Sequence, residues 1–281
     1  MPPILYDTHA HINFAAFKEN YKDLIAQTLA QGVWINNVGT QKDTSAEAAR
    51  ISEEFGDGVF AIVGLHPIHT LQQNVDEEES HFKTREEKFD YEYYRKLAEN
   101  PKVVGIGECG LDYYHVPEGM SIAEVRAIQA PAFKEQIRLA KEADKALAIH
   151  CRPSKGSTDA YDDILDILQA DGAPERLEIH SFTGSWAVCQ RFLELGSFVA
   201  LNGIITFDKT GVLAEVAENC PLERLIVETD APYLAPVPFR GKPNMPVYVR
   251  HTAEKIAAIK NLKFEEVAEA TTANARKLFR V

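Results

Sequence analysis

Two histidines stand one residue apart near the start of the chain, in the stretch YDTHAH that begins at Tyr6. An apolar pair precedes this stretch, as expected for a buried strand that ends here. Side chains alternate between the two faces of a strand, so His9 and His11 are expected to point the same way as Asp7. Imidazole and carboxylate groups on one face suit a bound metal ion. A strand end with two solvated or hydrogen-bonded histidines is the alternative.

Similar groups follow other short apolar runs of the sequence. Residues that could coordinate a metal ion or transfer a proton stand at or just past the ends of further runs: His66, Glu108, His150, His180 and Asp230. Five of the nine histidines therefore lie at run ends. The other four fall in expected loops and helices, and they are His69, His81, His115 and His251. This distribution indicates that the residues at the run ends contribute to a common function.

Taken one at a time, the run-end residues have simpler explanations. A lone histidine after an apolar strand is often a hydrogen-bonded core residue. Asp230 could cap or begin the turn before Pro232, and Glu108 could be a buried carboxylate paired with Arg152. Six run ends that all carry such groups would require six coincidences. We therefore expect these residues to form one site.

The make-up of this set indicates how many ions it holds. Four of these five histidines, together with the two carboxylates, already exceed the three or four protein ligands that one catalytic zinc ion takes. Two divalent ions are therefore expected, and the mixture of imidazole and carboxylate suits zinc, manganese or iron. A carboxylate can bridge two ions that lie about 3.5–4 Å apart. Glu108, at the middle of the set, is predicted to be the bridge.

Eight apolar runs would position these residues. They are ILYDTHAH, GVWINNVGT, VFAIVGLHP, KVVGIGECGLD, ALAIHCRP, RLEIHSFTG, SFVALNG and RLIVETDAP. Amphipathic stretches of helical length separate them, for example residues 123–143 and 159–169. This alternation indicates a parallel sheet with crossover helices, and eight units fit a closed (β/α)8 TIM barrel better than an open sheet. In such barrels the chemistry lies at the carboxyl ends of the strands, where the candidate residues stand.

The chain is predicted to be a single domain over residues 1–281, because no linker rich in Ser, Gly or Pro divides it. The stretch from Pro243 onwards predicts two helices, broken near residues 260–262, that close the barrel. Residues 72–94 are highly charged and predict a solvated loop and helix. Their position after the third run also allows a rim or lid over the site.

The composition restricts location and partners. The net charge of −12 excludes long-range attraction to nucleic acid or to an anionic membrane, so a polyanion must be held locally. No apolar run approaches the ~18 residues of a membrane span, and the first residues lack the features of a signal peptide, so a cytoplasmic protein without membrane contact is expected. The oligomeric state stays open, a monomer included. Reduced, buried thiols are expected at Cys109, Cys151, Cys189 and Cys220.

Seven ordered motifs resemble the signatures of the TatD family of metal-dependent deoxyribonucleases, and they cover the chain from end to end. They are DTHAH, GLHP, GIGECGLDYY, IHCR, HSFTG, ETDAPYLAP and RGKPN. The resemblance implies a barrel hydrolase that acts on DNA phosphodiesters, in its best known members as a magnesium-dependent 3′ to 5′ exonuclease. It also implies one metal bound by His9, His11, Glu108 and Asp230, and a second bound by Glu108, His150 and His180. Two features depart from the family: Met245 replaces a common Glu, and the charged stretch at 72–94 is longer than usual.

The remaining roles follow from metal-assisted hydrolysis of DNA, with 3′ ends or single-stranded regions as the expected substrate. Asp230 is the candidate to orient the attacking water and collect its proton. His66 resembles the family's HP motif and is expected to contact a phosphate oxygen without binding metal. Arg152 is a candidate second anion contact, with a structural pairing to Asp or Glu equally open.

Two other functions are compatible with the same residues. A metal-dependent amidohydrolase, lactonase or aminoacyl ester hydrolase can use much the same ligands on the same barrel, so the fold does not separate these substrates. A non-enzymatic barrel with structural metals is the second alternative. The complete ligand set disfavours it.

Overall fold

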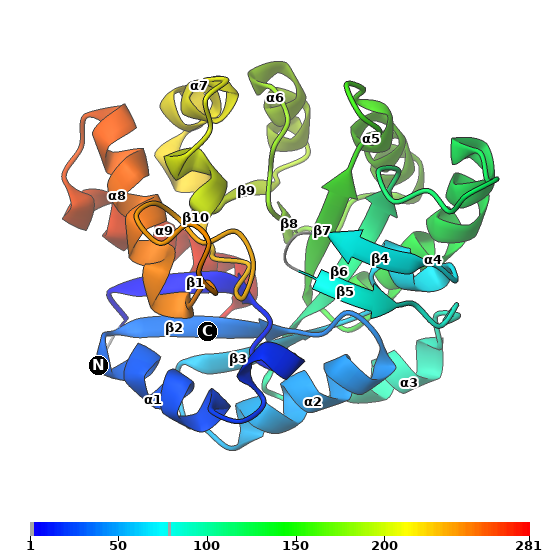
Figure 1. The fold of residues 1–281 in the computed structure, drawn as a ribbon, viewed down its shortest axis with the longest axis horizontal. Coiled ribbons are helices and arrows are strands. Elements are labelled where there is room, and N and C mark those ends of the chain that lie inside the picture. Colours follow the sequence, from blue (N-terminus) through cyan, green and yellow to red (C-terminus); the bar gives the residue numbers. More distant parts are fainter. Residues whose placement is uncertain (1–2, 78–79) are drawn as a thin grey trace.

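Eight parallel strands form a nearly closed barrel in the order β1–β2–β3–β6–β7–β8–β9–β10 (Figure 1). The computed structural model describes residues 3–77 and 80–281. The strands are β1 (Leu5–Ala10), β2 (Val33–Val38), β3 (Val59–Val63), β6 (Val103–Asp112), β7 (Ala146–Arg152), β8 (Leu177–Ile179), β9 (Phe198–Leu201) and β10 (Leu225–Val227). A parallel bridge between Ala10 and Ala231 brings the first and last strands together. The predicted (β/α)8 barrel and its eight predicted strands are confirmed.

Helices follow the strands on the outside of the barrel (Figure 1). They are α1 (Tyr21–Ala30), α2 (Lys42–Glu53), α3 (Tyr91–Ala98), α4 (Ile122–Glu142), α5 (Asp159–Asp171), α6 (Trp186–Glu194), α7 (Val212–Asn219), α8 (Val249–Lys260) and α9 (Phe264–Phe279). The predicted C-terminal pair is α8 and α9, separated at Asn261, whose φ of 54° ends the first helix. Across the described residues, no helix is both long enough and apolar enough to cross a membrane.

The strand starts carry an aromatic cluster that we call the barrel floor. It consists of Tyr6, Trp34 and Phe60, each the second residue of its strand, and Phe279 from the end of α9. The Tyr6 ring lies 6.1 Å from Trp34, 6.2 Å from Phe60 and 6.0 Å from Phe279, measured between centroids. Helix α9 therefore closes the end of the barrel opposite the strand exits. The four cysteines are free and buried, as predicted.

The charged segment 72–94 differs from its prediction. It holds an antiparallel hairpin, β4 (Asn74–Glu77) with β5 (Ser80–Lys83), ahead of the start of α3 (Figure 1). The predicted helix is therefore present, but a hairpin replaces the first part of the predicted loop. Glu78 and Glu79 of this segment lie outside the described residues.

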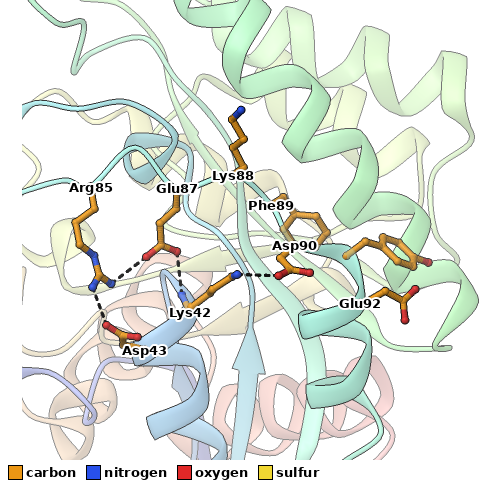
Figure 2. Close-up of a pocket in the computed structure, with 9 residues that line it drawn as sticks. Lys42, Asp43, Arg85, Glu87, Lys88, Phe89, Asp90 and Glu92 are labelled. Carbon is orange, nitrogen blue, oxygen red and sulfur yellow. Dashed lines mark hydrogen bonds and ion pairs between the residues drawn. The ribbon is translucent and has the colours of Figure 1, made fainter.

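Ion pairs attach the end of this segment to the start of α2 (Figure 2). The ammonium of Lys42 lies 2.8 Å from Asp90, and the guanidinium of Arg85 lies 2.8 Å from Asp43 and 2.9 Å from Glu87. These residues line an open cavity of about 780 Å³ beside the strand exits. Lys42 and Arg85 are paired with carboxylates here, so these two cations are already neutralised by neighbouring side chains.

Candidate metal centre

The exits of β1 and β10 hold the first group of candidate residues. The register of β1 against β2 shifts after Asp7, and a bulge of this kind re-aims neighbouring side chains. His9 and His11 lie with ring centroids 5.0 Å apart. The Asp7 carboxylate accepts hydrogen bonds from the Thr229 N–H (2.8 Å) and hydroxyl (2.6 Å). It thereby ties the β1 exit to the segment that carries Asp230.

Glu108 lies at the centre of five histidines. Its carboxylate oxygens approach the nearest imidazole nitrogens at 2.9 Å for His150, 3.3 Å for His9, 3.3 Å for His66, 3.6 Å for His180 and 3.8 Å for His11. Burial acts to raise the pKa of Glu108, but the surrounding histidines hold it well below its usual range. An ionised, central carboxylate of this kind is suited to bridge two cations.

Asp230 completes the β1 side of the site. Its Oδ1 lies 3.2 Å from His11 Nε2, while His11 Nδ1 lies 2.9 Å from the carbonyl oxygen of Val38. Because a carbonyl only accepts, His11 Nδ1 carries a proton and Nε2 is directed to Asp230. Burial acts to raise the pKa of Asp230, and the hydrogen bond with His11 lowers it overall. The φ of 59° at Asp230 is uncommon for a non-glycine residue, although Asp adopts this conformation more readily than most residues.

Two buried carboxylates that the sequence analysis did not single out hold the histidines on the other side. Glu228 Oε2 lies 2.9 Å from His180 Nδ1, and Asp112 Oδ2 lies 3.2 Å from His150 Nε2. Burial acts to lower the pKa of His180, but Glu228 and Glu108 raise it to about 10. The same negative field that favours a proton on this ring favours a metal cation in its place. Partners of this type fix the orientation of metal-binding imidazoles.

The donor atoms fit divalent cations. Three sets of three residues have donor atoms within 4.8 Å of one another: His9, His11 and Asp230; His66, Glu108 and His150; and His9, His180 and Glu228. Both ring nitrogens of His9 are buried and make no well-aligned hydrogen bond, and the nearest carboxylate oxygen to Nε2 is Glu108 Oε2, at 3.3 Å. Burial lowers the pKa of His9 and keeps the imidazole neutral. A neutral imidazole with unsatisfied buried nitrogens is what a metal ligand requires.

His66 stands apart from the other histidines in its hydrogen bonding. Its Nδ1 accepts the N–H of Ile68 at 3.2 Å, so the proton of the neutral ring lies on Nε2, 3.3 Å from Glu108. Burial lowers the pKa of His66 to about 4. His69, expected in a loop as a solvent-facing residue, is instead buried in the turn Pro67–Thr70, where burial lowers its pKa to about 3. The exposure of His69 could not be predicted from the sequence, because it depends on how this loop packs against the rest of the protein.

Arg152 ends β7 two residues after His150. Its guanidinium carbon lies 4.1 Å from the centroid of the Tyr114 ring, on the loop that follows β6. The sequence analysis gave an ion pair with Arg152 as one alternative for Glu108. The Glu108 carboxylate faces the histidines instead.

A (β/α)8 barrel whose strand exits gather buried imidazoles around a carboxylate defines a class, the barrel hydrolases that use bound metal ions. Comparison with known proteins narrows the class. Residues 6–280 match the sequence model of the family described as TatD related DNase. The chain therefore belongs to the TatD family, as its motifs predicted, and is a metal-dependent hydrolase.

Individual relatives agree with this assignment. The chain is 36% identical over 280 residues to the uncharacterized metal-dependent hydrolase YabD of Bacillus subtilis, with 99% of this chain and 100% of YabD covered. It is 34% identical over 282 residues to the uncharacterized metal-dependent hydrolase YcfH of Escherichia coli, with 99% and 96% covered. The crystal structure of YJJV, a TatD homolog from Escherichia coli, matches with a TM-score of 0.82 and 28% identity over the whole of both chains.

Proposed function

We propose that this hydrolase is a deoxyribonuclease that cleaves DNA phosphodiesters from 3′ ends, with water activated by two metal ions. The observation that carries the proposal is the placement of Glu108 among five histidines, with Asp230 3.2 Å from one of them. The family description supports DNA as the substrate.

Two sets of ligands share Glu108 in this proposal. His9, His11, Glu108 and Asp230 would hold one ion, and Glu108, His150 and His180 would hold the other. Ions of magnesium, zinc or manganese bound there would lower the pKa of a water molecule and stabilise the charge that develops on the phosphate. The donor atoms of His9, His11 and Asp230 lie within 4.8 Å of one another, which supports the first set. Glu228 and Asp112 orient His180 and His150, which is compatible with the second set.

Three side chains near Glu108 would take part in the hydrolysis in other ways. Asp230 keeps an acidic carboxylate, so it can orient a water molecule and accept its proton. His66 carries its proton on Nε2, which makes it a hydrogen-bond donor to a phosphate oxygen rather than a ligand through that nitrogen. Arg152, two residues past His150, provides a guanidinium for phosphate.

The acidic surface is compatible with an anionic substrate under this proposal. A net charge of −12 opposes approach of DNA at long range, so binding depends on contacts within the site. Double-stranded DNA has a higher charge density than single strands, so single-stranded 3′ ends are the preferred substrate.

The test combines metal analysis with substrate comparison. Purified protein is depleted of metal, reloaded with magnesium, manganese or zinc, and incubated with DNA labelled at either end. The proposal predicts stepwise shortening from the 3′ end that depends on metal. Bis-p-nitrophenyl phosphate is assayed beside an ester and a lactone, and turnover of the ester or lactone alone would support the competing hydrolase functions.

A further inference from the structure

Tyr114 is an exposed aromatic residue in a structurally restrained position. Its side chain is 52% exposed, the largest exposed fraction among the described Phe, Tyr and Trp side chains. The preceding residue, Tyr113, is buried and donates a hydrogen bond to Asp163 at 2.7 Å. Adjacent tyrosines thus have opposite environments, one facing the core and one facing solvent.

The backbone around Tyr114 is fixed by the metal centre itself. Asp112 Oδ1 accepts the N–H of Tyr114 at 3.0 Å and the N–H of His115 at 2.9 Å, while its Oδ2 lies 3.2 Å from His150 Nε2. Asp112 is in turn held by Gln129, which bonds to both its N–H and its carbonyl. The position of Tyr114 relative to His150 is therefore set by a short chain of hydrogen bonds.

Arg152 covers one face of the Tyr114 ring. The backbones of Asp112 and Arg152 are register partners in β6 and β7, and the N–H of Tyr113 bonds to the carbonyl of Arg152 at 2.8 Å. The guanidinium stacks on the ring at 4.1 Å, a cation–π arrangement. Stacking uses the face of the guanidinium, whose N–H groups lie in its own plane.

Arg152 lies further out along β7 than His150 of the metal centre. Arg152 follows His150 by two residues on an extended strand, which places it about 7 Å further along the strand axis. This length is comparable with the spacing of neighbouring phosphates along a single strand. This offset is compatible with a base beside Tyr114 when the phosphate of the same or the neighbouring nucleotide reaches the centre.

We propose that Tyr114 and Arg152 form a stacking platform that binds a nucleobase next to the scissile phosphodiester. Every base has an aromatic face, so the platform selects for a nucleobase without selecting its identity. Stacking needs an unpaired base, so the platform favours single-stranded ends over duplex. The inference rests on the proposed deoxyribonuclease function and adds a substrate contact to the same site.

The test pairs a protein variant with a substrate variant. Wild-type protein, Tyr114→Leu and Tyr114→Phe are assayed on a single-stranded oligonucleotide and on the same oligonucleotide with abasic 3′-terminal nucleotides. The KM of each protein for the normal oligonucleotide is divided by its KM for the abasic oligonucleotide, which has no terminal base to stack. Leu262→Ala, an exposed apolar residue before α9, is the control.

Tyr114→Leu is expected to raise the KM for the normal oligonucleotide about tenfold relative to the abasic oligonucleotide, within the range for loss of one base stack. Tyr114→Phe keeps the ring and should behave as wild type. The abasic oligonucleotide should be a poor substrate for wild type and no poorer for Tyr114→Leu. Equal losses on both oligonucleotides, or no loss on either, would overturn the platform.

Failure of the deoxyribonuclease function is distinguishable from failure of the platform. A wild-type protein that cleaves no oligonucleotide contradicts the function. Binding of a fluorescent oligonucleotide in calcium, followed by anisotropy, then tests the platform alone. Weaker binding by Tyr114→Leu than by Tyr114→Phe supports the platform, and no binding by wild type, or equal binding by the two variants, overturns it.

Discussion

The two ends of the barrel are lined by different kinds of side chain: ionisable groups at the strand exits and aromatic rings at the strand starts. At the strand exits, histidines surround Glu108, and the buried nitrogens of His9 make no well-aligned hydrogen bond. At the strand starts, the barrel floor packs aromatic rings, with Tyr6 and Phe279 centroids 6.0 Å apart. Buried unsatisfied polar groups cost stability, whereas buried aromatic contacts contribute to it. The exits are therefore organised for chemistry, and the floor for stability.

This contrast leads to separable effects of mutation. Substitutions at the exits are expected to change hydrolysis and metal binding while the fold persists. Substitutions at the floor are expected to change stability while hydrolysis by the folded protein persists. The following predictions test this separation, in order of decreasing effect on hydrolysis.

Glu108→Ala is expected to abolish hydrolysis and weaken the binding of both metals, because one carboxylate serves both ions in the proposed site. Metal content after dialysis and hydrolysis of labelled DNA are the measurements. Glu118→Ala, on the exposed loop before α4, is the control and should resemble wild type. If the Glu108 variant kept two tightly bound metals per chain, Glu108 would not be the bridge.

Asp230→Asn is expected to retain most metal binding and to lose about 10²–10⁴-fold in rate, the usual range for removal of a general base. The amide can still coordinate through its oxygen but does not accept the proton from water. Hydrolysis and metal stoichiometry are measured on the same sample. Asp166→Asn, on the exposed face of α5, serves as the control. A rate close to that of wild type would assign Asp230 a structural role only.

His66→Ala is expected to leave metal content intact and to cost on the order of 2–4 kcal/mol in transition-state stabilisation, as for other lost oxyanion donors. The reason is that Nε2 carries the proton, so the ring donates a hydrogen bond. The kcat/KM on a short oligonucleotide is compared with that of His251→Ala, a histidine of α8. A His66 variant that lost one metal would show that this ring belongs to the coordination sphere.

Phe279→Ala is expected to have the smallest effect on hydrolysis and a large effect on stability. Removing a buried aromatic ring typically costs about 3–5 kcal/mol in the free energy of unfolding. Urea unfolding measures the stability, and kcat at 25 °C measures the activity of the folded protein. Leu262→Ala is the exposed control. A tenfold drop in kcat together with an unchanged urea midpoint would contradict the separation of the two ends.

The sequence predicted most of the fold because short apolar runs recur along the chain, separated by amphipathic stretches of helical length. It also located the candidate residues, because barrel strands end at a common face. Asp112 and Glu228 were missed, although a usable signal existed. Asp112 ends the same strand, β6, that carries Glu108, and Glu228 directly follows β10, two residues before Asp230. Both are carboxylates at strand exits, which is the signal that selected the other candidates.

Three other structural features could not be predicted from the local sequence pattern. The hairpin β4–β5 lies in a charged stretch, where four-residue strands give a weak alternating signal. The burial of His69 depends on how a loop folds back over the strands, which is a tertiary effect. The stacking of Arg152 on Tyr114 depends on the register of β6 and β7, and no sequence spacing encodes it.

The central claim is a centre for two metal ions with Glu108 between them, and it is tested most directly by the number of ions bound at full activity. Metal-free protein is titrated with manganese while bound metal and hydrolysis are measured together. The account predicts that activity reaches its maximum only when two ions are bound per chain. Full activity with one ion bound per chain would contradict it.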